Sequence, residues 1–228
     1  ADLIRHRNPD AQIDVREGRV EQHLDALDGL DLLIVAVDGE NAKFAINEAC
    51  LERRLLAIYA GVYERGEGGD VVIIRPYEGP CYACWSAELR EGMATPPPGG
   101  EVELDYGMIG EAGTLEAEPG LYVHVTKVAT VQTDLALNEL LRGTSVYETM
   151  PGNTIIIANN ALEILDGHTN PPHTALWVDV PRDPKCLVCG EALRQDAAHD
   201  AVTLDQLASD MGIVFDDEEA QAQGRIAD

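Results

Sequence analysis

The sequence predicts an α/β protein with a mostly parallel sheet, continued by antiparallel strands toward the carboxyl terminus. The apolar run DLLIVAV at residues 31–37 is typical of a parallel strand that is buried on both faces. Strand and helix patterns then alternate up to residue 75, which is the rhythm of β-α-β units. Two later strand patterns, at residues 154–158 and 174–180, are expected to pair antiparallel.

The elements of the first half follow from hydrophobic periodicity. Leu24 and Leu27 fall on one side of a short helix, and Ile46 lies on the buried side of a longer one. A glycine-rich turn separates two strands of the sheet. In order, the predicted elements are a strand at residues 12–20, a helix at 20–27, a strand at 31–37, a helix at 42–53, a strand at 55–59, a turn at 61–70 and a strand at 71–75.

The longest helix is expected over residues 121–142, where Val128 and Leu135 belong to a set of apolar residues at helical spacing. Pro119 precedes it and Gly143 follows it, which is the asymmetry expected of helix ends. The helix therefore links the first half of the sheet to the two later strands.

Two polar segments carry little hydrophobic patterning. Residues 92–120 contain the run PPPGG and predict a long mobile loop, since long loops in compact domains are usually functional or disordered. Residues 191–228 are acidic and predict a partly disordered tail. The tail contains one short helix candidate, which Thr203 could cap. We expect one domain at residues 1–190, followed by this tail.

Composition excludes several classes of function. The 228 residues carry a net charge of −25, which argues against nucleic acid as a partner because phosphates require Lys and Arg. The sequence holds no apolar run long enough to cross a membrane and no signal peptide at its start. Four of its five cysteines fall in close pairs, which fits a reducing, cytoplasmic setting.

Two C-x-x-C pairs carry the strongest signal in the sequence. Cys81 and Cys84 form one pair, and Cys186 and Cys189 form the other. Each pair can direct two thiolates at a common centre, and two pairs supply the four ligands of a tetrahedral, structural zinc site. More than a hundred residues separate the pairs, so the metal would join distant parts of the chain. Two disulfides, or a redox C-x-x-C, are the alternatives.

The amino-terminal residues have the pattern of a helix end. Leu3 and Ile4 are followed by Arg5, His6 and Arg7, and basic residues suit a helix carboxyl terminus. Pro9 then ends the helix. Because a domain rarely opens on the end of a helix, we expect the chain to be truncated at its amino end relative to the complete protein.

Several of these motifs, in this order, resemble one family. They are Asn8-Pro9, the strand that ends at Asp38, Asn47 three residues before Cys50, the sequence GPCYAC at residues 79–84, the long helix, and the pair Cys186/Cys189. Together they resemble the carboxyl-terminal part of the ThiF/MoeB/HesA superfamily of ubiquitin-activating-enzyme-like adenylyltransferases. The resemblance covers residues 3 to about 190, which is most of the chain.

The resemblance implies a Rossmann-like sheet that binds ATP and Mg²⁺. It implies attachment of AMP to the carboxyl-terminal glycine of a ubiquitin-like or sulfur-carrier protein, which requires stabilisation of charge around phosphates. Asp38 matches the family aspartate that works near magnesium and the nucleotide, so it is the candidate catalytic and cofactor-binding residue. From the residues alone, Asp38 could instead be the N-cap of the helix that follows it.

The chain also departs from the family pattern. The glycine-rich phosphate loop G-x-G-x-x-G is not found, and the glycines at residues 66–69 lack the strand–turn–helix context that holds phosphate. We therefore expect this polypeptide alone to bind ATP poorly and to be inactive. Residues 85–122 hold no cysteine, and Cys50 lies among apolar residues, so we expect adenylylation without a thioester in this chain.

The resulting expectation is a ThiF-like adenylyltransferase with structural zinc that works as a homodimer. One alternative is a non-catalytic, zinc-containing module that binds a ubiquitin-like partner. Another is a relative that adenylylates a small peptide. The residues encoded before Ala1 would discriminate between an enzyme and a binding module, because only the enzyme requires a phosphate loop.

Overall fold

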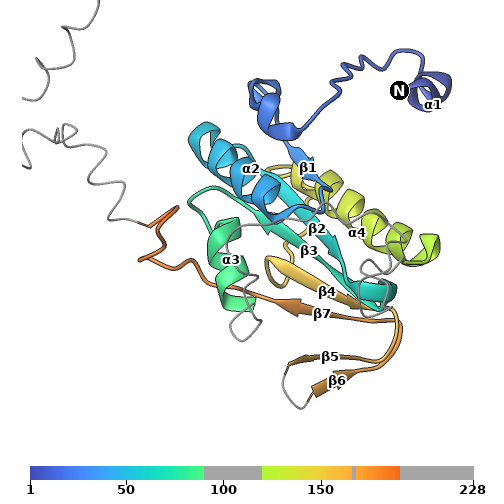
Figure 1. Cartoon of the computed structure of the whole chain (residues 1–228), viewed down its shortest axis with the longest axis vertical. Helices are drawn as coiled ribbons and strands as arrows, with labels where there is room; N and C mark the ends of the chain where they lie inside the picture. Colours follow the sequence, from blue (N-terminus) through green and yellow to red (C-terminus); the bar gives the residue numbers. More distant parts are fainter. Residues whose placement is uncertain (90–119, 166–167, 191–228) are drawn as a thin grey trace, which may run out of the picture.

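A five-stranded sheet forms the centre of the protein (Figure 1). The computed structural model describes residues 1–89, 120–165 and 168–190. The predicted tail at 191–228 lies outside these residues, as does the predicted loop at 92–120 apart from Gly120. None of the helices in the described ranges combines the length and the apolar character needed to cross a membrane.

The strand order in the large sheet is β1-β2-β3-β4-β7, and a separate hairpin pairs β5 with β6. The strands are β1 (Leu33–Val35), β2 (Ala57–Val62), β3 (Gly68–Ile74), β4 (Thr154–Ala158), β5 (Leu162–Leu165), β6 (His168–Asn170) and β7 (Thr174–Val178). The α-helices are α1 (Asp2–Arg7), α2 (Glu40–Arg53), α3 (Tyr82–Leu89) and α4 (Tyr122–Leu140). Three short 3₁₀ turns are η1 (Val20–Gln22), η2 (Leu24–Leu27) and η3 (Glu64–Gly66).

The direction of the strands differs from the expectation of a mostly parallel sheet. Only β1 and β2 pair in parallel, through the crossover helix α2. The pairs β2–β3, β3–β4 and β4–β7 are antiparallel. The expectation is therefore wrong for the described strands, whereas the antiparallel continuation is confirmed. For the pair β2–β3 the cause is the short link at residues 63–67, because a parallel connection needs a crossover of a dozen or more residues.

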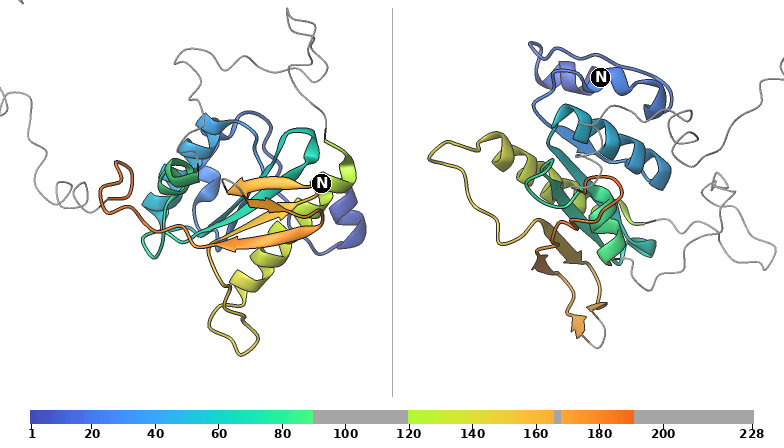
Figure 2. Two further views of the ribbon diagram at one scale, coloured as in Figure 1. Left: turned by 90° about the horizontal axis from the view of Figure 1, so that it is seen from below. Right: turned by 90° about the vertical axis from the view of Figure 1, so that its left-hand side faces the viewer.

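Helices cover both faces of the large sheet, with α2 and α3 on one side and α4 on the other (Figures 1 and 2). Alternate residues of each central strand supply the two cores, as the two-residue period of a strand requires. In β2, Tyr59 packs in the core beneath α2 and α3, and its neighbour Ile58 packs against α4. In β3, Val72 packs in the core beneath α2 and α3, and its neighbour Val71 packs against α4.

Buried polar groups attach α4 to three strands. The side-chain amide of Gln132 donates to the carbonyl oxygens of Val35 at 2.9 Å and Ile58 at 2.8 Å, so one side chain bridges β1 and β2. Further along the helix, the carboxylate of Glu139 accepts two bonds from the Arg75 guanidinium, at 2.9 and 2.6 Å. This hydrogen-bonded carboxylate raises the pKa of Arg75. The helix therefore holds β1 and β2 in register and fixes the far end of β3.

Some predicted elements are confirmed and others are wrong. The helix at 42–53 and the long helix before Gly143 are present with small shifts of their ends, and the strand at 154–158 is present with its predicted ends. The strand expected at 12–20 is wrong: residues 12–19 form no strand and pair with none of the described strands. The helix expected at 20–27 is replaced by the two turns η1 and η2.

Candidate functional site

The four paired cysteines converge on one point. Cys81 directly precedes α3, Cys84 lies in its first turn, and Cys186 and Cys189 lie in a turn after β7. The Sγ atoms of Cys81 and Cys84 are 3.7 Å apart, and Cys81 and Cys186 are 3.8 Å apart. Cys84 and Cys189 are 3.4 Å apart. All four sulfur atoms lie within 4.8 Å of one another and are buried, so this cysteine cluster could hold a metal ion.

The distances in the cysteine cluster fit a tetrahedral ion. Four sulfur atoms at about 2.3 Å from a zinc ion would be about 3.8 Å from each other. A disulfide requires about 2.05 Å between sulfur atoms, and all five cysteines of the chain are free thiols here. Because one pair follows β3 and the other follows β7, an ion in the cluster would join α3 to the segment after β7.

Backbone geometry shapes the second cysteine pair. The amide N–H of Val188 donates to the Cys186 sulfur at 3.4 Å, and the amide of Gly190 donates to the Cys186 carbonyl at 2.8 Å. A Cβ on Gly190 would collide with that same carbonyl oxygen, so the turn requires glycine at this position. The arrangement holds the Cys186 sulfur toward the other three.

The surroundings of the sulfur atoms shift their pKa values in different directions. Burial raises the pKa of Cys84 to about 11 and also raises the pKa of Cys81. Burial acts in the same direction on Cys186, but backbone donors at Cys189 and Val188 outweigh it, so the pKa of Cys186 is lowered. Because a metal ion binds thiolates, its binding would displace protons from Cys81 and Cys84.

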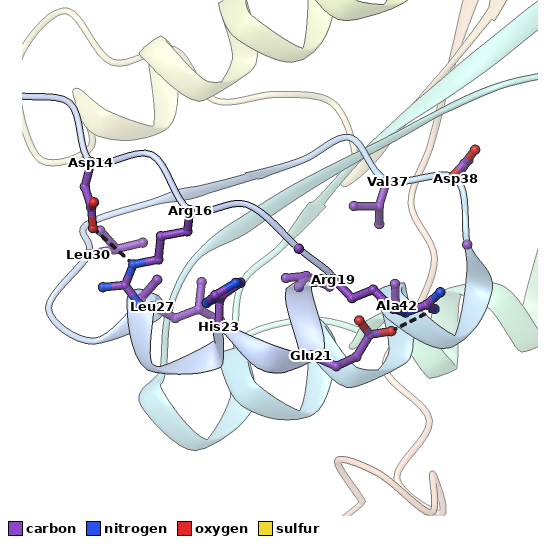
Figure 3. A pocket seen from close by; sticks show the side chains of 14 residues that line it. Asp14, Arg16, Arg19, Glu21, His23, Leu27, Leu30, Val37, Asp38 and Ala42 are labelled. Carbon is purple, nitrogen blue, oxygen red and sulfur yellow. Dashed lines mark hydrogen bonds and ion pairs between the residues drawn. The ribbon is translucent and has the colours of Figure 1, made fainter. Parts of the chain in front are cut away.

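Asp38 lies at the end of β1, at the rim of a cavity of about 740 Å³ (Figure 3). The side chain is exposed, and within the described ranges no hydrogen bond or ion pair involves its carboxylate. The N-cap of α2 is Gly39, without a side-chain capping bond, so the alternative role of Asp38 as N-cap is wrong. The carboxylate points away from the basic side chains of the cavity, and it is free to bind a cation or a polar ligand.

The cavity contains functional candidates that sequence reasoning missed. Arg16, Arg19 and His23 line it from the segment before η2, opposite the start of α2 (Figure 3). Acidic neighbours hold both arginines: Asp14 and Asp25 lie 3.0 and 2.7 Å from Arg16, and Glu21 lies 3.4 Å from Arg19. The segment carries as many acidic as basic side chains, so its composition gives no signal of a basic site.

Cys50 is buried in α2, with 1% of its surface exposed, and burial raises its pKa to about 11. We therefore expect the folded protein to resist alkylation of Cys50 by iodoacetamide at about pH 8, where an exposed thiol would react. Mass spectrometry should find Cys50 unmodified in the native state and modified after unfolding in guanidinium chloride. Rapid native-state modification of Cys50 would contradict this prediction.

A match over most of the chain assigns it to one class of protein. Residues 1–182 match the ThiF family, so this chain belongs to the ThiF family. The resemblance inferred from the motifs is thereby confirmed.

Individual relatives match over shorter stretches. Ubiquitin-like modifier-activating enzyme 5 of Caenorhabditis briggsae is 30% identical over 96 residues, which cover 36% of this chain and 22% of the relative. The protein of the same name from Drosophila melanogaster is 42% identical over 55 residues, 24% of this chain and 14% of the relative. The chain thus aligns with less than a quarter of the length of these relatives.

Among solved structures, the crystal structure of E. coli MccB with succinimide has a TM-score of 0.50 against this chain, at 14% sequence identity. The superposition covers 83% of this chain and 48% of MccB. This likeness shows a shared fold, and it places no substrate or partner in this chain.

Proposed function

We propose that this chain is part of an ATP-dependent adenylyltransferase that activates the carboxyl terminus of a ubiquitin-like or sulfur-carrier protein. Membership of the ThiF family supports adenylyltransferase-type activity at the level of the family. The observation that carries the proposal is the exposed carboxylate of Asp38, without a bond to any described residue, at the carboxyl end of β1 and the rim of the cavity. Ligands of open α/β sheets bind outside this end of the strands.

The proposed reaction forms one bond and breaks another. The carboxylate of the carrier protein attacks the α-phosphorus of ATP, a carboxyl–phosphate bond forms, and pyrophosphate leaves with the electrons of the broken bond. Asp38 would supply carboxylate oxygen, the ligand type that Mg²⁺ prefers. A magnesium ion there would neutralise charge on the phosphates. Arg16 and Arg19 lie where they could orient an anionic ligand in the same cavity.

The cysteine cluster is proposed to hold structural zinc. Thiolate ligands and tetrahedral spacing are what zinc prefers, and four protein ligands leave no open coordination position for water or substrate. Cys81, Cys84, Cys186 and Cys189 would therefore stabilise the fold rather than take part in adenylylation. We propose a cytoplasmic location, because five free cysteines fit a reducing compartment.

No thioester step is assigned to the described cysteines. Cys50 is buried in a hydrophobic core, and the other four belong to the cysteine cluster. Transfer of the activated carboxyl group is therefore proposed to occur on another protein.

We propose that two copies of the chain associate through the solvent face of α4. Tyr122, Leu137 and Leu140 on that helix are 82%, 57% and 54% exposed, although the protein as a whole is strongly acidic. Exposed apolar side chains on one element mark an interaction surface. A face with little charge is also where two copies that each carry −25 can approach with least repulsion.

The test uses the full open reading frame that encodes this chain. Purified protein is given ATP, Mg²⁺, radiolabelled pyrophosphate and a candidate carrier protein. Label should pass into ATP only when the carrier has a free terminal carboxylate, because that group is the nucleophile. A carrier with an amidated terminus is the matched control. Binding of the carrier without any exchange would replace the proposal by the non-catalytic module, and exchange with a short peptide would identify a peptide-adenylating relative.

A further inference from the structure

Tyr82 lies between the cysteine cluster and the helix that follows Asp38. It lies between Cys81 and Cys84 in the sequence, and it is the first residue of α3. Its side chain is 2% exposed and enters the core beneath α2. The residue therefore connects the cysteine cluster to the helix that directly follows Asp38.

Tyr82 is hydrogen-bonded to α2 at two places. Its backbone N–H donates to the side-chain oxygen of Asn47 at 2.9 Å, and Asn47 is fully buried. Its hydroxyl donates to the carboxylate of Glu40, with distances of 3.2 and 3.3 Å to the two oxygens. Glu40 and Asn47 are about 10 Å apart along the helix axis, given the rise per residue of an α-helix. The tyrosine thus lies along α2 from its middle to its first residue.

Aromatic neighbours fix the orientation of the Tyr82 ring. The ring stacks on Tyr59 of β2 with centroids 4.6 Å apart and an interplanar angle of 21°. Phe44 meets it edge-on at 5.5 Å, and Trp85 lies 5.3 Å away on the next turn of α3. Because these rings pack so closely around it, the hydroxyl of Tyr82 can point only toward the amino end of α2.

The carboxylate of Glu40 has a second partner in the same place. The ammonium group of Lys43 lies 3.0 Å from Glu40 and 6.0 Å from the centroid of the Tyr82 ring, and only 12% of the Lys43 side chain is exposed. The amide of Lys43 donates to the carbonyl of Gly39 at 3.1 Å, which closes the first turn of α2. Gly39 follows Asp38 directly, so these bonds fix the backbone from which Asp38 projects.

We infer that Tyr82 is a positioning residue that couples the cysteine cluster to Asp38. An ion in the cysteine cluster would fix the start of α3. The hydrogen bond from Tyr82 would then fix the position of Glu40, and the first turn of α2 would hold Asp38 at the rim of the cavity. The inference rests on the proposed metal in the cluster and on the proposed role of Asp38. The proposed ion would thereby help to position Asp38 at the carboxyl end of β1.

Amide hydrogen exchange measured by NMR on the zinc-loaded protein tests this coupling. In Tyr82→Phe, which keeps the ring and loses only the hydroxyl, the Lys43 amide should exchange about tenfold faster, as expected for loss of a hydrogen bond to a charged group. The amide of Leu135 in α4 should be unchanged, which distinguishes local release from a general loss of stability. Glu40→Gln removes the charge of the acceptor and provides a second variant with the same expected direction.

Tyr59→Phe is the matched control. It also removes one buried tyrosine hydroxyl and keeps the ring that stacks on Tyr82, but the Tyr59 hydroxyl has no hydrogen-bond partner among the described residues. This variant should leave the exchange rate of the Lys43 amide as in the wild type.

Removal of zinc by a chelator supplies the second arm of the test. Chelation should speed exchange of the Lys43 amide in the wild type. It should increase that exchange rate much less in Tyr82→Phe, because the hydrogen bond between Tyr82 and Glu40 is already lost there. Unchanged Lys43 exchange in a Tyr82→Phe protein with full zinc content would overturn the inference. So would a wild type whose Lys43 amide does not respond to chelation. Neither measurement needs turnover, so failure of the pyrophosphate exchange assay is a separate result that bears on the proposed function alone.

Discussion

Replacement of Cys84 by serine is expected to lower the melting temperature by at least about 10 °C and to abolish stoichiometric zinc binding. Structural zinc contributes on the order of 10 kcal/mol to the folding of small zinc modules, and a chain of this size loses about 2–4 °C per kcal/mol. The sulfur of Cys84 lies 3.4 Å from that of Cys189, and both are buried, so serine would leave an incomplete ligand set inside the protein. Calorimetry and metal analysis measure both effects.

Cys50→Ser is the matched control for this substitution, because Cys50 is equally buried but belongs to α2 and not to the cysteine cluster. It should lose some packing energy and keep one zinc ion per chain. A chelator that leaves the melting temperature of the wild type unchanged would contradict the metal site. Because bound sulfur is thiolate, protons compete with the ion, and the stability that the metal supplies should fall as the pH falls.

Asp38→Asn is expected to reduce pyrophosphate exchange by the complete protein by about 10²–10³-fold, a typical cost of removing one group that stabilises charge in a transition state. The amide keeps the shape of the side chain and loses the charge that would hold Mg²⁺. Stability should change by less than about 0.5 kcal/mol, because the side chain is exposed and bonds to no described residue. A large loss of activity without a loss of stability would separate a functional role from a structural one.

Asp31→Asn provides the comparison for Asp38→Asn. Asp31 is also exposed and lies before the opposite end of β1, and it is not among the residues that line the cavity. Pyrophosphate exchange by the Asp31→Asn variant should stay near the wild-type rate, with the same dependence on Mg²⁺. Equal rates for the two variants and the wild type would remove Asp38 from the proposed chemistry.

Local patterns predicted the features that depend on neighbouring residues. The two C-x-x-C pairs were sufficient to predict that Cys81, Cys84, Cys186 and Cys189 form one cluster. Hydrophobic periodicity was sufficient for α2 and for the long helix α4. The strand β4 was predicted with its observed ends, because the apolar residues of TIIIA lie between turn residues on both sides.

Features that depend on distant partners could not be predicted in the same way. Whether a strand pairs in parallel is decided by the length and path of its connection, and the link at residues 63–67 turned β3 back against β2. The bond between the Tyr82 hydroxyl and Glu40 joins residues 42 positions apart. The cavity beside Asp38 was missed for a similar reason, since Arg16 and Arg19 acquire their place only when the segment before η2 packs beside the start of α2.

The separation of 105 residues between Cys81 and Cys186 also determines when the cysteine cluster can form during folding. Closing a loop of that length costs about 4 kcal/mol of chain entropy, and each C-x-x-C pair alone offers an ion only two ligands. The pairing of β3 with β4 and of β4 with β7 brings the two pairs together. Capture of an ion by the cysteine cluster would therefore be a late event that stabilises a sheet already assembled, and newly made chains would remain metal-free until their carboxyl-terminal strands have been synthesised and have paired.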